Sequence, residues 1–437
     1  MKKNIRKINH TAAGIDIGAS DIFIAIENKP VVSFRTFTEN YIQAIDYLKQ
    51  NKITTVAMEA TGVYWFPLYE MIEQSGIEVY LVNGRAMRNV PGRKSDVQDC
   101  QWLQELHSYG LLRRCFIPDD FIRQLRTYSR LRQDHLSLAA QHIQHMQKAF
   151  DSMNIKLHNV ISQINGTSGM RIVKAIISGV RNPNELACLC EDSILKTKKD
   201  LVIASLKGNF REEYIFSLSQ AVDAYEFYLQ KALQCDKKIE ELLNRLTKDK
   251  AEPKNIKPPK TIRHNAPQIN DLHLMLMKLT GGKDPSQVTG LTDKTLLELI
   301  AETGTDLSQW KTEKHFTSWL CLAPGKHQSG KKNKRRNKKG HTKAGQIFRN
   351  AAYALTKSKY TAIGAFYHRL KAKKGPLIAI KATARKIAIL YYNVMTKGIE
   401  FVEKGITAYQ QKVKEQRLKY LQKQAKQLGY NLSPMIA

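Results

Sequence analysis

The stretch AAGIDIGASDIFIAIENKPVVSFRTF, residues 12–37, decides the fold of the N-terminal part of this chain. It holds three short apolar runs, and the residues between them include the Gly, Ser, Asn and Pro that favour turns. Runs rich in Ile, Val and Phe between turn residues are typical of strands. The stretch therefore predicts three consecutive strands in an antiparallel meander, at 12–18, 21–27 and 31–37.

The residues after this meander alternate between helical and strand-like patterns. Ile42, Ile45 and Leu48 recur at helical spacing, whereas residues 54–59 are rich in β-branched side chains. We expect a helix, a strand, a helix, a strand and a last helix capped by Ser95, at 41–51, 54–59, 65–75, 79–82 and 95–108. This order of elements is that of the ribonuclease H-like (RuvC-like) α/β fold, which we expect for residues 1–115.

Four acidic residues occupy positions at which this fold would bring carboxylates together. Asp16 lies in the first strand, and Glu59 ends the fourth. Asp96 and Asp99 lie on the helix after the fifth strand, and their i,i+3 spacing puts both on one face. Clustered carboxylates repel one another unless divalent cations neutralise them. Such a group can hold two Mg²⁺ ions about 3.5–4 Å apart for phosphoryl transfer.

Each acidic residue also has a simpler interpretation. Asp16 in the sequence DIG is similar to the strand and turn that bind nucleotide phosphate through Mg²⁺ in sugar-kinase and actin-like folds. Glu59 can cap a strand, and Asp96 and Asp99 can be first-turn acids that the helix dipole favours. The metal site is favoured because all four residues occur in the order that the fold requires.

Positive charge is concentrated in the C-terminal third of the chain. The net charge is +31, but residues 1–110 hold 12 basic and 12 acidic residues and are neutral. Residues 314–399 hold 21 Lys and Arg and no Asp or Glu. A segment without counter-charges favours a polyanionic partner, and we expect DNA or RNA. The candidate contacts are Lys326, Lys331, Lys332, Lys334, Arg335, Arg336, Lys338, Lys339, Lys343 and Arg349.

The bulk composition indicates a soluble protein of several domains. A length of 437 residues with 42% hydrophobic residues suits two or three domains with real cores. The six cysteines are scattered and form no CxxC pair, which argues against a zinc site or a disulfide framework. The basic N-terminus has no apolar run behind it, and no segment is apolar for long enough to span a membrane. We expect a cytoplasmic, nucleoid-associated prokaryotic protein with no membrane partner.

The middle of the chain, 116–250, has the periodicity of long helices. Over 136–153, apolar residues recur three and four positions apart. A second run, 218–246, keeps a heptad seam with one polar residue, Asp236, at a core position. The two runs predict either an intramolecular helical hairpin or a coiled coil between chains, and the sequence leaves both open.

Beyond this region, four prolines interrupt any periodicity over 251–268, which predicts a linker. Helical spacing returns in a C-terminal domain at 269–397, where a helix–turn–helix-like unit at 288–310 has Gly290 and Gly304 in its turns. Their backbone amides would either receive phosphates or only allow the helices to pack. Residues 398–437 are expected to form a helical C-terminal tail.

One potentially nucleophilic side chain, Ser329, lies within the basic segment. It follows a turn at Pro324 and Gly325 and precedes Gly330, so we expect it in an exposed loop. Free serine is a poor nucleophile, and His327 is the only base near it in the sequence. Ser329 would be either a turn former or a nucleophile activated by a metal or by carboxylates from another part of the fold.

Several long strings make the chain similar to a known family. They are GIDIGASD, MEATGVYW, LVNGRAMRNVPGRKSDVQD and RQLRTYSRLRQ in the N-terminal part, and TGLTDKTLLELIAETG, WLCLAPGKHQSGKK and HTKAGQIFRNAAYAL in the C-terminal part. Through them nearly the whole chain resembles transposases of the insertion-sequence 110/1111 family, relatives of the pilin-gene invertases. The dense basic run after Ser329, the long helical insertion and the long tail depart from the commonest pattern of that family.

The resemblance implies roles for the residues singled out above. The four acidic residues match the DEDD metal ligands of the family, and Ser329 matches the serine that forms a covalent phosphoserine bond to DNA. The family also implies a composite site formed by this serine and the acidic domain. It further implies an oligomer, a dimer or a tetramer, that is guided by a structured bridge RNA pairing with donor and target DNA.

The sequence thus predicts a Mg²⁺-dependent DNA recombinase of an insertion sequence, with DNA, a guide RNA and copies of itself as partners. One alternative is a RuvC-like, structure-specific nuclease that uses water, in which Ser329 is structural. A second is a non-catalytic nucleic-acid-binding remnant. An actin-like kinase, suggested by the string DIGAS, lacks a second phosphate loop in this sequence.

Overall fold

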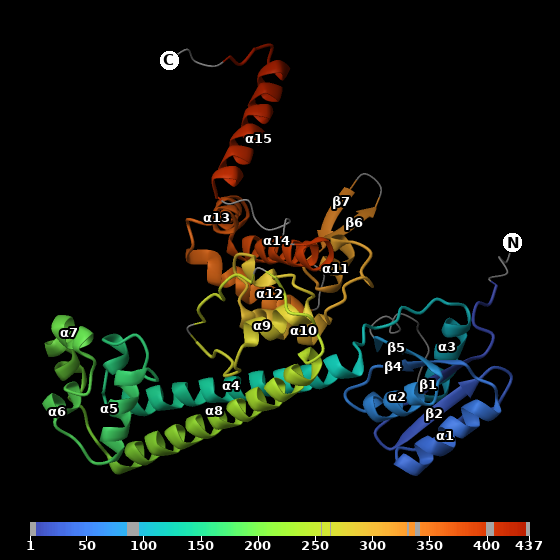
Figure 1. Cartoon of the computed structure of the whole chain (residues 1–437), viewed down its shortest axis with the longest axis horizontal. Coiled ribbons are helices and arrows are strands. Elements are labelled where there is room, and N and C mark those ends of the chain that lie inside the picture. Colours follow the sequence, from blue (N-terminus) through green and yellow to red (C-terminus); the bar gives the residue numbers. More distant parts are fainter. Residues whose placement is uncertain are drawn as a thin grey trace. The chain divides into compact units, whose positions relative to one another are not determined.

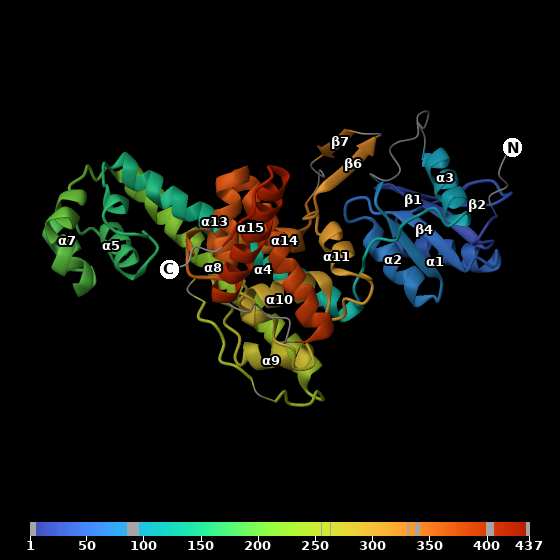
Figure 2. The same cartoon turned by 90° about the horizontal axis from the view of Figure 1, so that it is seen from above.

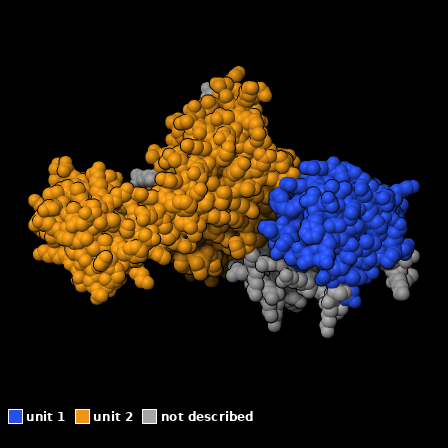
Figure 3. Space-filling model, turned by 90° about the horizontal axis from the view of Figure 1, so that it is seen from below, with its two compact units in different colours: residues 1–117 blue, residues 118–437 orange. Residues whose placement is uncertain are grey.

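The computed structural model describes residues 6–84, 96–254, 256–262, 264–329, 332–336, 341–398 and 406–433, with the backbone alone at 326–329, 332–336, 406, 407 and 409. The chain divides into two compact units, Met1–Ile117 and Pro118–Ala437 (Figure 3). Within the part of the chain that is described, no helix is both long enough and apolar enough to cross a membrane.

The first unit is built on a five-stranded sheet with the order β3-β2-β1-β4-β5 (Figure 1). β2 runs antiparallel to β1 and β3, which confirms the predicted meander, whereas β4 is parallel to β1 and β5. The order and directions of the strands agree with the ribonuclease H-like fold predicted from the sequence. The strands are β1 (Ala12–Ile17), β2 (Asp21–Ile26), β3 (Val32–Arg35), β4 (Thr55–Glu59) and β5 (Glu78–Val82).

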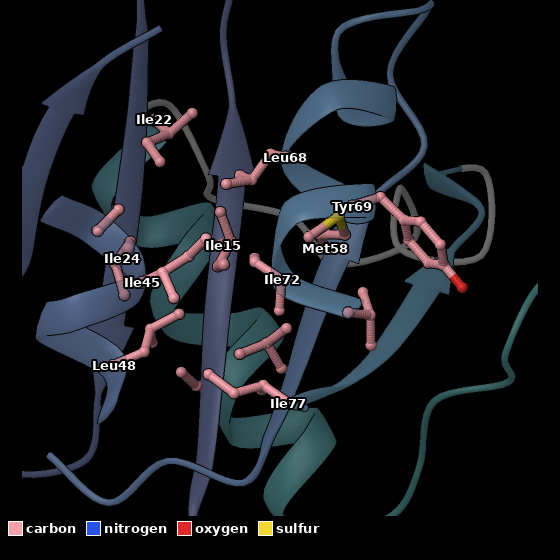
Figure 4. Close-up of a cluster of buried hydrophobic side chains, with 14 of the residues drawn as sticks. Ile15, Ile22, Ile24, Ile45, Leu48, Met58, Leu68, Tyr69, Ile72 and Ile77 are labelled. Atoms are coloured by element: carbon pink, nitrogen blue, oxygen red, sulfur yellow. The ribbon is translucent and has the colours of Figure 1, made fainter. Parts of the chain in front are cut away.

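Helices cover both faces of this sheet. α1 (Thr38–Gln50) and α2 (Trp65–Gln74) pack on one face, and α3 (Asp96–Ser108) packs on the other (Figure 2). The face under α1 and α2 holds the main core of the unit, where Ile15 of β1 and Leu68 of α2 belong to one buried cluster (Figure 4). Burying an aliphatic side chain of this size contributes about 1.5–3 kcal/mol to stability.

The start of α1 differs from the sequence-based prediction, and the predicted cap of α3 lies outside the described residues. α1 begins at Thr38, one turn before the predicted start at 41. That first turn is polar, so it adds nothing to the apolar periodicity from which the start was predicted. The residue predicted to cap α3, Ser95, lies outside the described residues, and the helix is described from Asp96.

The opposite face of the sheet is shaped by Gly14. A β-carbon at Gly14 would lie 2.2 Å from the carbonyl oxygen of Cys100 and 2.4 Å from the amide nitrogen of Gln104. The backbone of α3 therefore lies directly against β1, a spacing that only glycine allows. Leu103 of α3 belongs to a small buried cluster with Ala57 of β4 on this face. Gly14 thus sets how closely α3 approaches the strand that carries the first predicted metal ligand.

Two long helices, α4 (Asp120–Ser152) and α8 (Glu212–Thr247), lie side by side in the second unit (Figure 1). Met146 and Phe150 near the end of α4 belong to one buried cluster with Leu218 near the start of α8. The two helices are therefore antiparallel. Of the two arrangements that the periodicity left open, the structure forms the hairpin within one chain.

The polar residue in the heptad seam, Asp236, pairs with Arg132. Arg132 donates from Nε to Oδ1 of Asp236 at 2.5 Å and from Nη2 to Oδ2 at 3.4 Å, and both side chains are buried. The predicted linker is hydrogen-bonded to this pair. The backbone amide of Gln268 donates to Asp236 at 3.1 Å, and Arg132 donates to the carbonyl of Asn265 at 3.2 Å. The polar seam position is therefore satisfied within the chain.

Shorter helices complete the second unit. Between α4 and α8 lie η2 (Leu157–Asn159), α5 (Thr167–Ile177), α6 (Pro183–Ala187) and α7 (Asp192–Ser205). The C-terminal part is mostly helical, as predicted, and packs around aromatic residues such as Phe316, Phe348 and Tyr391. Its helices are α9 (Leu272–Leu279), η3 (Pro285–Gln287), α10 (Asp293–Thr303), α11 (Glu313–Trp319), α12 (Lys343–Ala354), η4 (Leu355–Lys357), α13 (Ala362–Lys374), α14 (Pro376–Lys397) and α15 (Ile406–Gln427).

The helix–turn–helix-like unit predicted at 288–310 differs in two ways from the expectation. Thr292 caps α10, but the following helix begins only at Glu313. The N–H of Gly304 donates to the carbonyl of Ile300 at 2.8 Å and closes α10. That amide is already used, so of the two roles left open for Gly304 the structure favours helix packing over phosphate binding.

A β-hairpin that the sequence did not predict follows α11. β6 (Gly325–Ser329) pairs antiparallel with β7 (Lys332–Arg336). Ser329 is the last residue of β6, so the predicted loop conformation is wrong. The strings GKHQS and KNKRR contain no apolar residue, and without apolar alternation neither strand carries the usual sequence signal.

Candidate active site

Side-chain alternation puts two of the predicted metal ligands on the α3 face of the sheet. Ile15 of β1 belongs to the core under α1 and α2, so its neighbours Gly14 and Asp16 lie on the other face. Met58 of β4 belongs to the same core, so Glu59 also lies on the α3 face. Ile15 and Met58 pair in parallel register. The two acidic residues, each one position further on, are therefore neighbours at the carboxyl ends of adjacent parallel strands.

The carboxyl group of Asp16 is the electrostatic centre of this site. Its pKa is raised to about 6, first by burial and then by the negative charge of Asp96. Asp99 and Glu59 raise the pKa further, whereas the N–H of Ile17, which donates to Oδ1 at 3.0 Å, lowers it. The other three acidic residues therefore all act on Asp16. A divalent cation relieves repulsion of this kind among hard oxygen ligands.

The carboxylate of Glu59 is placed by a glycine that sequence reasoning missed. A β-carbon on Gly84 would lie 1.8 Å from Oε1 of Glu59 and 2.5 Å from its Cδ. Gly84 therefore leaves the space that this carboxylate occupies. The backbone around Glu59 is fixed as well, because Thr61 donates to its carbonyl at 3.0 Å and Ala60 donates to Val82 at 2.9 Å. The only signal for Gly84 in the sequence is a glycine just after the apolar strand, in LVNG.

The other two acidic residues lie in the first turn of α3. Asp96 is exposed and Asp99 is half-buried. The next residue toward the sheet, Cys100, is buried, and burial together with the charge of Asp16 raises the pKa of its thiol to about 12. Cys100 is therefore a neutral thiol near neutral pH and adds no charge to the site. The two carboxylates of α3 are placed beside Asp16 by the close contact at Gly14.

The donor set fits Mg²⁺ in its chemistry, since all four side chains offer carboxylate oxygens. Within the described residues, however, no three His, Cys, Asp or Glu side chains gather closely enough to hold one ion. The four acidic residues are thus electrostatic neighbours around Asp16 and do not form a closed coordination shell.

The β-hairpin carries Ser329 and half of the predicted basic contacts. Ser329 is opposite Lys332 in the register of the hairpin, and His327 is opposite Lys334. The remaining described members, Lys343 and Arg349, lie on α12. Three predicted contacts lie outside the described residues: Lys331, Lys338 and Lys339. Those on the hairpin are Lys326, Lys332, Lys334, Arg335 and Arg336.

The N-terminal turn of α12 is held firmly in place. Thr342 caps the helix, and its Oγ1 accepts from the N–H of Gly345 at 3.0 Å. A β-carbon on Gly345 would lie 2.3 Å from the carbonyl oxygen of Leu320, so α12 packs directly on the end of α11. Arg349 donates to Oε1 of Gln346 at 3.3 Å. This packing gives the basic residues of α12 defined positions.

Comparison with known families assigns the chain. A model of DEDD-type IS110 proteins, described as a transposase, matches residues 13–155, which include the sheet, the four acidic residues and α4. A second, described as the transposase IS116/IS110/IS902 family, matches residues 286–368, which include Ser329, the hairpin and α12. No curated protein matches the chain. One match includes the four acidic residues, and the other includes Ser329. On these two matches the chain belongs to the IS110 family of transposases.

Proposed function

We propose that this transposase is a Mg²⁺-dependent recombinase that cuts and exchanges DNA strands at the ends and the target of its insertion sequence. The observation that carries the proposal is the group of four carboxylates centred on Asp16, on one face of the sheet. A transposase acts on phosphodiesters, and hard carboxylate ligands of this kind serve phosphoryl transfer in proteins.

The residues that would hold Mg²⁺ are Asp16, Glu59, Asp96 and Asp99. Bound there, Mg²⁺ would polarise the scissile phosphate and offset the negative charge that develops on it. With its pKa raised to about 6, Asp16 is mostly ionised at neutral pH and can act as a ligand there, whereas it takes up a proton as the pH falls below 6. Glu59 keeps its position through the space beside Gly84. The sheet and α3 thus fix the directions from which the ligands approach.

Ser329 is the proposed nucleophile. Its Oγ forms a bond to the phosphorus of the scissile phosphodiester, and the bond from that phosphorus to one DNA oxygen breaks. The serine proton passes to a base at the site, and the departing DNA oxygen leaves as a hydroxyl after taking up a proton. One phosphoester replaces another, so the phosphoester bond is exchanged and is not hydrolysed by water. A DNA hydroxyl can then attack the phosphoserine and join a new strand pair.

The basic residues of the hairpin would stabilise the charge of the pentavalent phosphate in this step. Lys332, opposite Ser329 in register, is the nearest of them along the hairpin backbone. The absence of acidic residues from 314–399 also suits contact with nucleic acid backbones. From the family resemblance we further propose that a structured guide RNA selects the DNA sites and that the protein acts as a dimer or a tetramer.

The test is cleavage and strand transfer on element-end DNA with Mg²⁺ and the flanking transcript. We expect Ser329→Ala and Asp16→Asn each to abolish both activities. Ser217→Ala, at an exposed serine of α8, is the matched control and should leave them unchanged. Cleavage that survives in Ser329→Ala would contradict the proposal and identify a nuclease that uses water. DNA binding without any cleavage in the parent protein would identify a non-catalytic remnant.

A further inference from the structure

A cavity of about 410 Å³ lies within the second unit, between α4, α10 and α12. This volume falls in the range of small-ligand sites, about 300–1,000 Å³. Most of the lining residues carry polar or charged groups on apolar stems: α4 contributes Arg130, α10 contributes Lys294 and Glu298, and α12 contributes Lys343 together with the apolar Ile347. The cavity belongs to neither the carboxylate cluster nor the hairpin that carries Ser329.

Lys294 and Glu298 are one helical turn apart on α10 and both line the cavity. Burial lowers the pKa of the Lys294 ammonium and raises that of the Glu298 carboxyl. Among the described residues, neither side chain makes a hydrogen bond or an ion pair. The two charges attract each other, since Glu298 raises the pKa of Lys294 and Lys294 lowers that of Glu298, but this attraction does not offset the effect of burial. The pair therefore presents a hydrogen-bond donor and an acceptor that the protein itself leaves unused.

Arg130 and Ile347 supply flat and apolar surfaces in the same cavity. The guanidinium of Arg130 is fixed by two hydrogen bonds to Glu302, from Nε to Oε1 at 2.8 Å and from Nη2 to Oε2 at 2.9 Å. Glu302 is itself buried. A guanidinium plane held in this way is a surface on which a nucleobase can stack, and Ile347 offers a second apolar contact.

Amide groups add further capacity for hydrogen bonds. Gln133 of α4 lines the cavity, as do Gln346 and Asn350 of α12. Nε2 of Gln346 donates to Oδ1 of Asn350 at 2.9 Å, which fixes both amides relative to each other. Lys343, in the first turn of α12, belongs to the basic segment of residues 314–399 and suits a phosphate.

The ligand has to satisfy both charges of α10 at once. An acidic peptide or inorganic phosphate would pair with Lys294 but would leave Glu298 without a donor. A nucleobase offers donors and acceptors side by side on one edge. Guanine offers two adjacent N–H donors, at N1 and N2, for a carboxylate, and its O6 for an ammonium. The other bases lack two adjacent donors beside an acceptor on that edge.

We propose that this cavity takes up an unpaired guanine nucleotide of the nucleic acid that the transposase holds. Glu298 accepts from the N1 and N2 positions, Lys294 donates to O6, the ring stacks on Arg130, and Lys343 contacts the phosphate. The proposal rests on the proposed binding of nucleic acid but not on Ser329 chemistry. Enzymes that act on duplexes read extruded bases through polar pockets of this type.

The test measures binding of the full-length protein to labelled DNA and RNA duplexes that carry one unpaired guanine. For comparison, the same duplexes carry an unpaired adenine, an unpaired cytosine, or an unpaired thymine (DNA) or uracil (RNA). A fully paired duplex is measured as well. Unlabelled GMP and AMP serve as free-nucleotide competitors. The variants are Glu298→Gln and Lys294→Met, and the matched controls are Glu241→Gln and Lys237→Met, at exposed positions of α8.

We expect the parent protein to prefer the unpaired guanine over an unpaired adenine by roughly tenfold, the discrimination that one good bidentate base contact gives. Each cavity variant should reduce this preference to less than about twofold and should bind the paired duplex with the affinity of the parent. The control variants should bind every duplex as the parent does. Both cavity variants should melt close to the parent, because each removes a half-buried charge that makes no hydrogen bond.

Equal affinity for all four unpaired bases would overturn the proposal, as would a guanine preference that survives in both cavity variants. Strong GMP binding without any preference among the duplexes would show that the cavity serves a free nucleotide and would overturn the nucleic-acid source. Failure of the Ser329 chemistry would leave these results unaffected, so the two proposals fail separately.

Discussion

Oε1 of Glu59 occupies the position that a side chain on Gly84 would need, since a β-carbon there would lie only 1.8 Å away. The conflict is with the end of a flexible side chain and not with backbone. A substitution at Gly84 would therefore displace the Glu59 carboxylate without breaking the sheet. In this way a residue with no chemistry of its own fixes the position of a proposed metal ligand.

The variant Gly84→Ala tests this relationship. We expect Mg²⁺-dependent cleavage to fall about 100-fold, because a displacement of about 1 Å at a catalytic group has an effect of that size. Thermal stability should change little. Gly166→Ala, whose glycine has negative φ and no contact closer than 3.4 Å, is the control and should keep full activity. Full activity in Gly84→Ala would show that Glu59 is not a ligand.

The variant Gly14→Ala tests the packing of α3 on β1. Here the added β-carbon meets backbone, 2.2 Å from the carbonyl oxygen of Cys100, so α3 itself has to move. We expect a loss of about 1–3 kcal/mol in the free energy of unfolding, the usual effect of overpacking. Urea denaturation measures it. An unchanged midpoint would contradict the close contact between helix and strand.

The buried pair of Arg132 and Asp236 predicts a non-additive double mutant. Asp236→Ala should cost about 3–5 kcal/mol, because it leaves the Arg132 guanidinium buried without its partner. Adding Arg132→Met should recover much of that loss, whereas Asp223→Ala, at an exposed position of α8, should have little effect. Chemical denaturation of the parent, the single variants Asp236→Ala and Arg132→Met and the double variant measures the coupling. Additive losses would mean that the two side chains do not interact.

His107 predicts a pH dependence of stability in the first unit. It is buried, its Nε2 lies 2.9 Å from Oγ1 of Thr55, and burial lowers its pKa to about 4. The unfolded chain binds a proton at about pH 6.5, so it holds more protons than the folded protein between pH 6.5 and 4. The stabilisation from neutral His107 is therefore complete above pH 6.5 and is lost as the pH falls. The fall of the pKa from 6.5 to about 4 corresponds to about 3 kcal/mol.

The variant His107→Gln tests whether His107 causes this loss of stability at low pH. Melting temperatures measured from pH 7.5 to 4.5 should fall with pH in the parent protein, and the fall should be smaller in the variant. Gln can keep a hydrogen bond to Thr55 but does not titrate. Parallel curves for the two proteins would show that His107 does not contribute to the acid sensitivity.

Much of the first unit could be predicted from the sequence. Its strands alternate around buried residues such as Ile15 and Met58, and this pattern gave the order of the elements and the positions of Asp16 and Glu59. The contacts that refine the site could not be predicted in the same way. Gly14 and Gly84 act through the absence of a side chain, and only the positions of Cys100 and Glu59 in space reveal why glycine is required.

The second unit was less predictable for physical reasons of its own. Heptad spacing showed that Asp236 occupies a core position, but periodicity carries no information on the partner, and Arg132 lies in a part of α4 that mixes polar and apolar residues. The hairpin of β6 and β7 has no apolar alternation. The charges of Lys294 and Glu298 look in the sequence like an ordinary solvent-exposed pair on a helix.

The most direct test of the central claim is mass spectrometry of the transposase after incubation with element-end DNA, Mg²⁺ and the flanking transcript. We expect a peptide in which Ser329 carries a DNA phosphate, and we expect Asp16→Asn to remove this adduct. Cleaved DNA without any adduct, at an unchanged rate in Ser329→Ala, would contradict the account and indicate that water is the nucleophile.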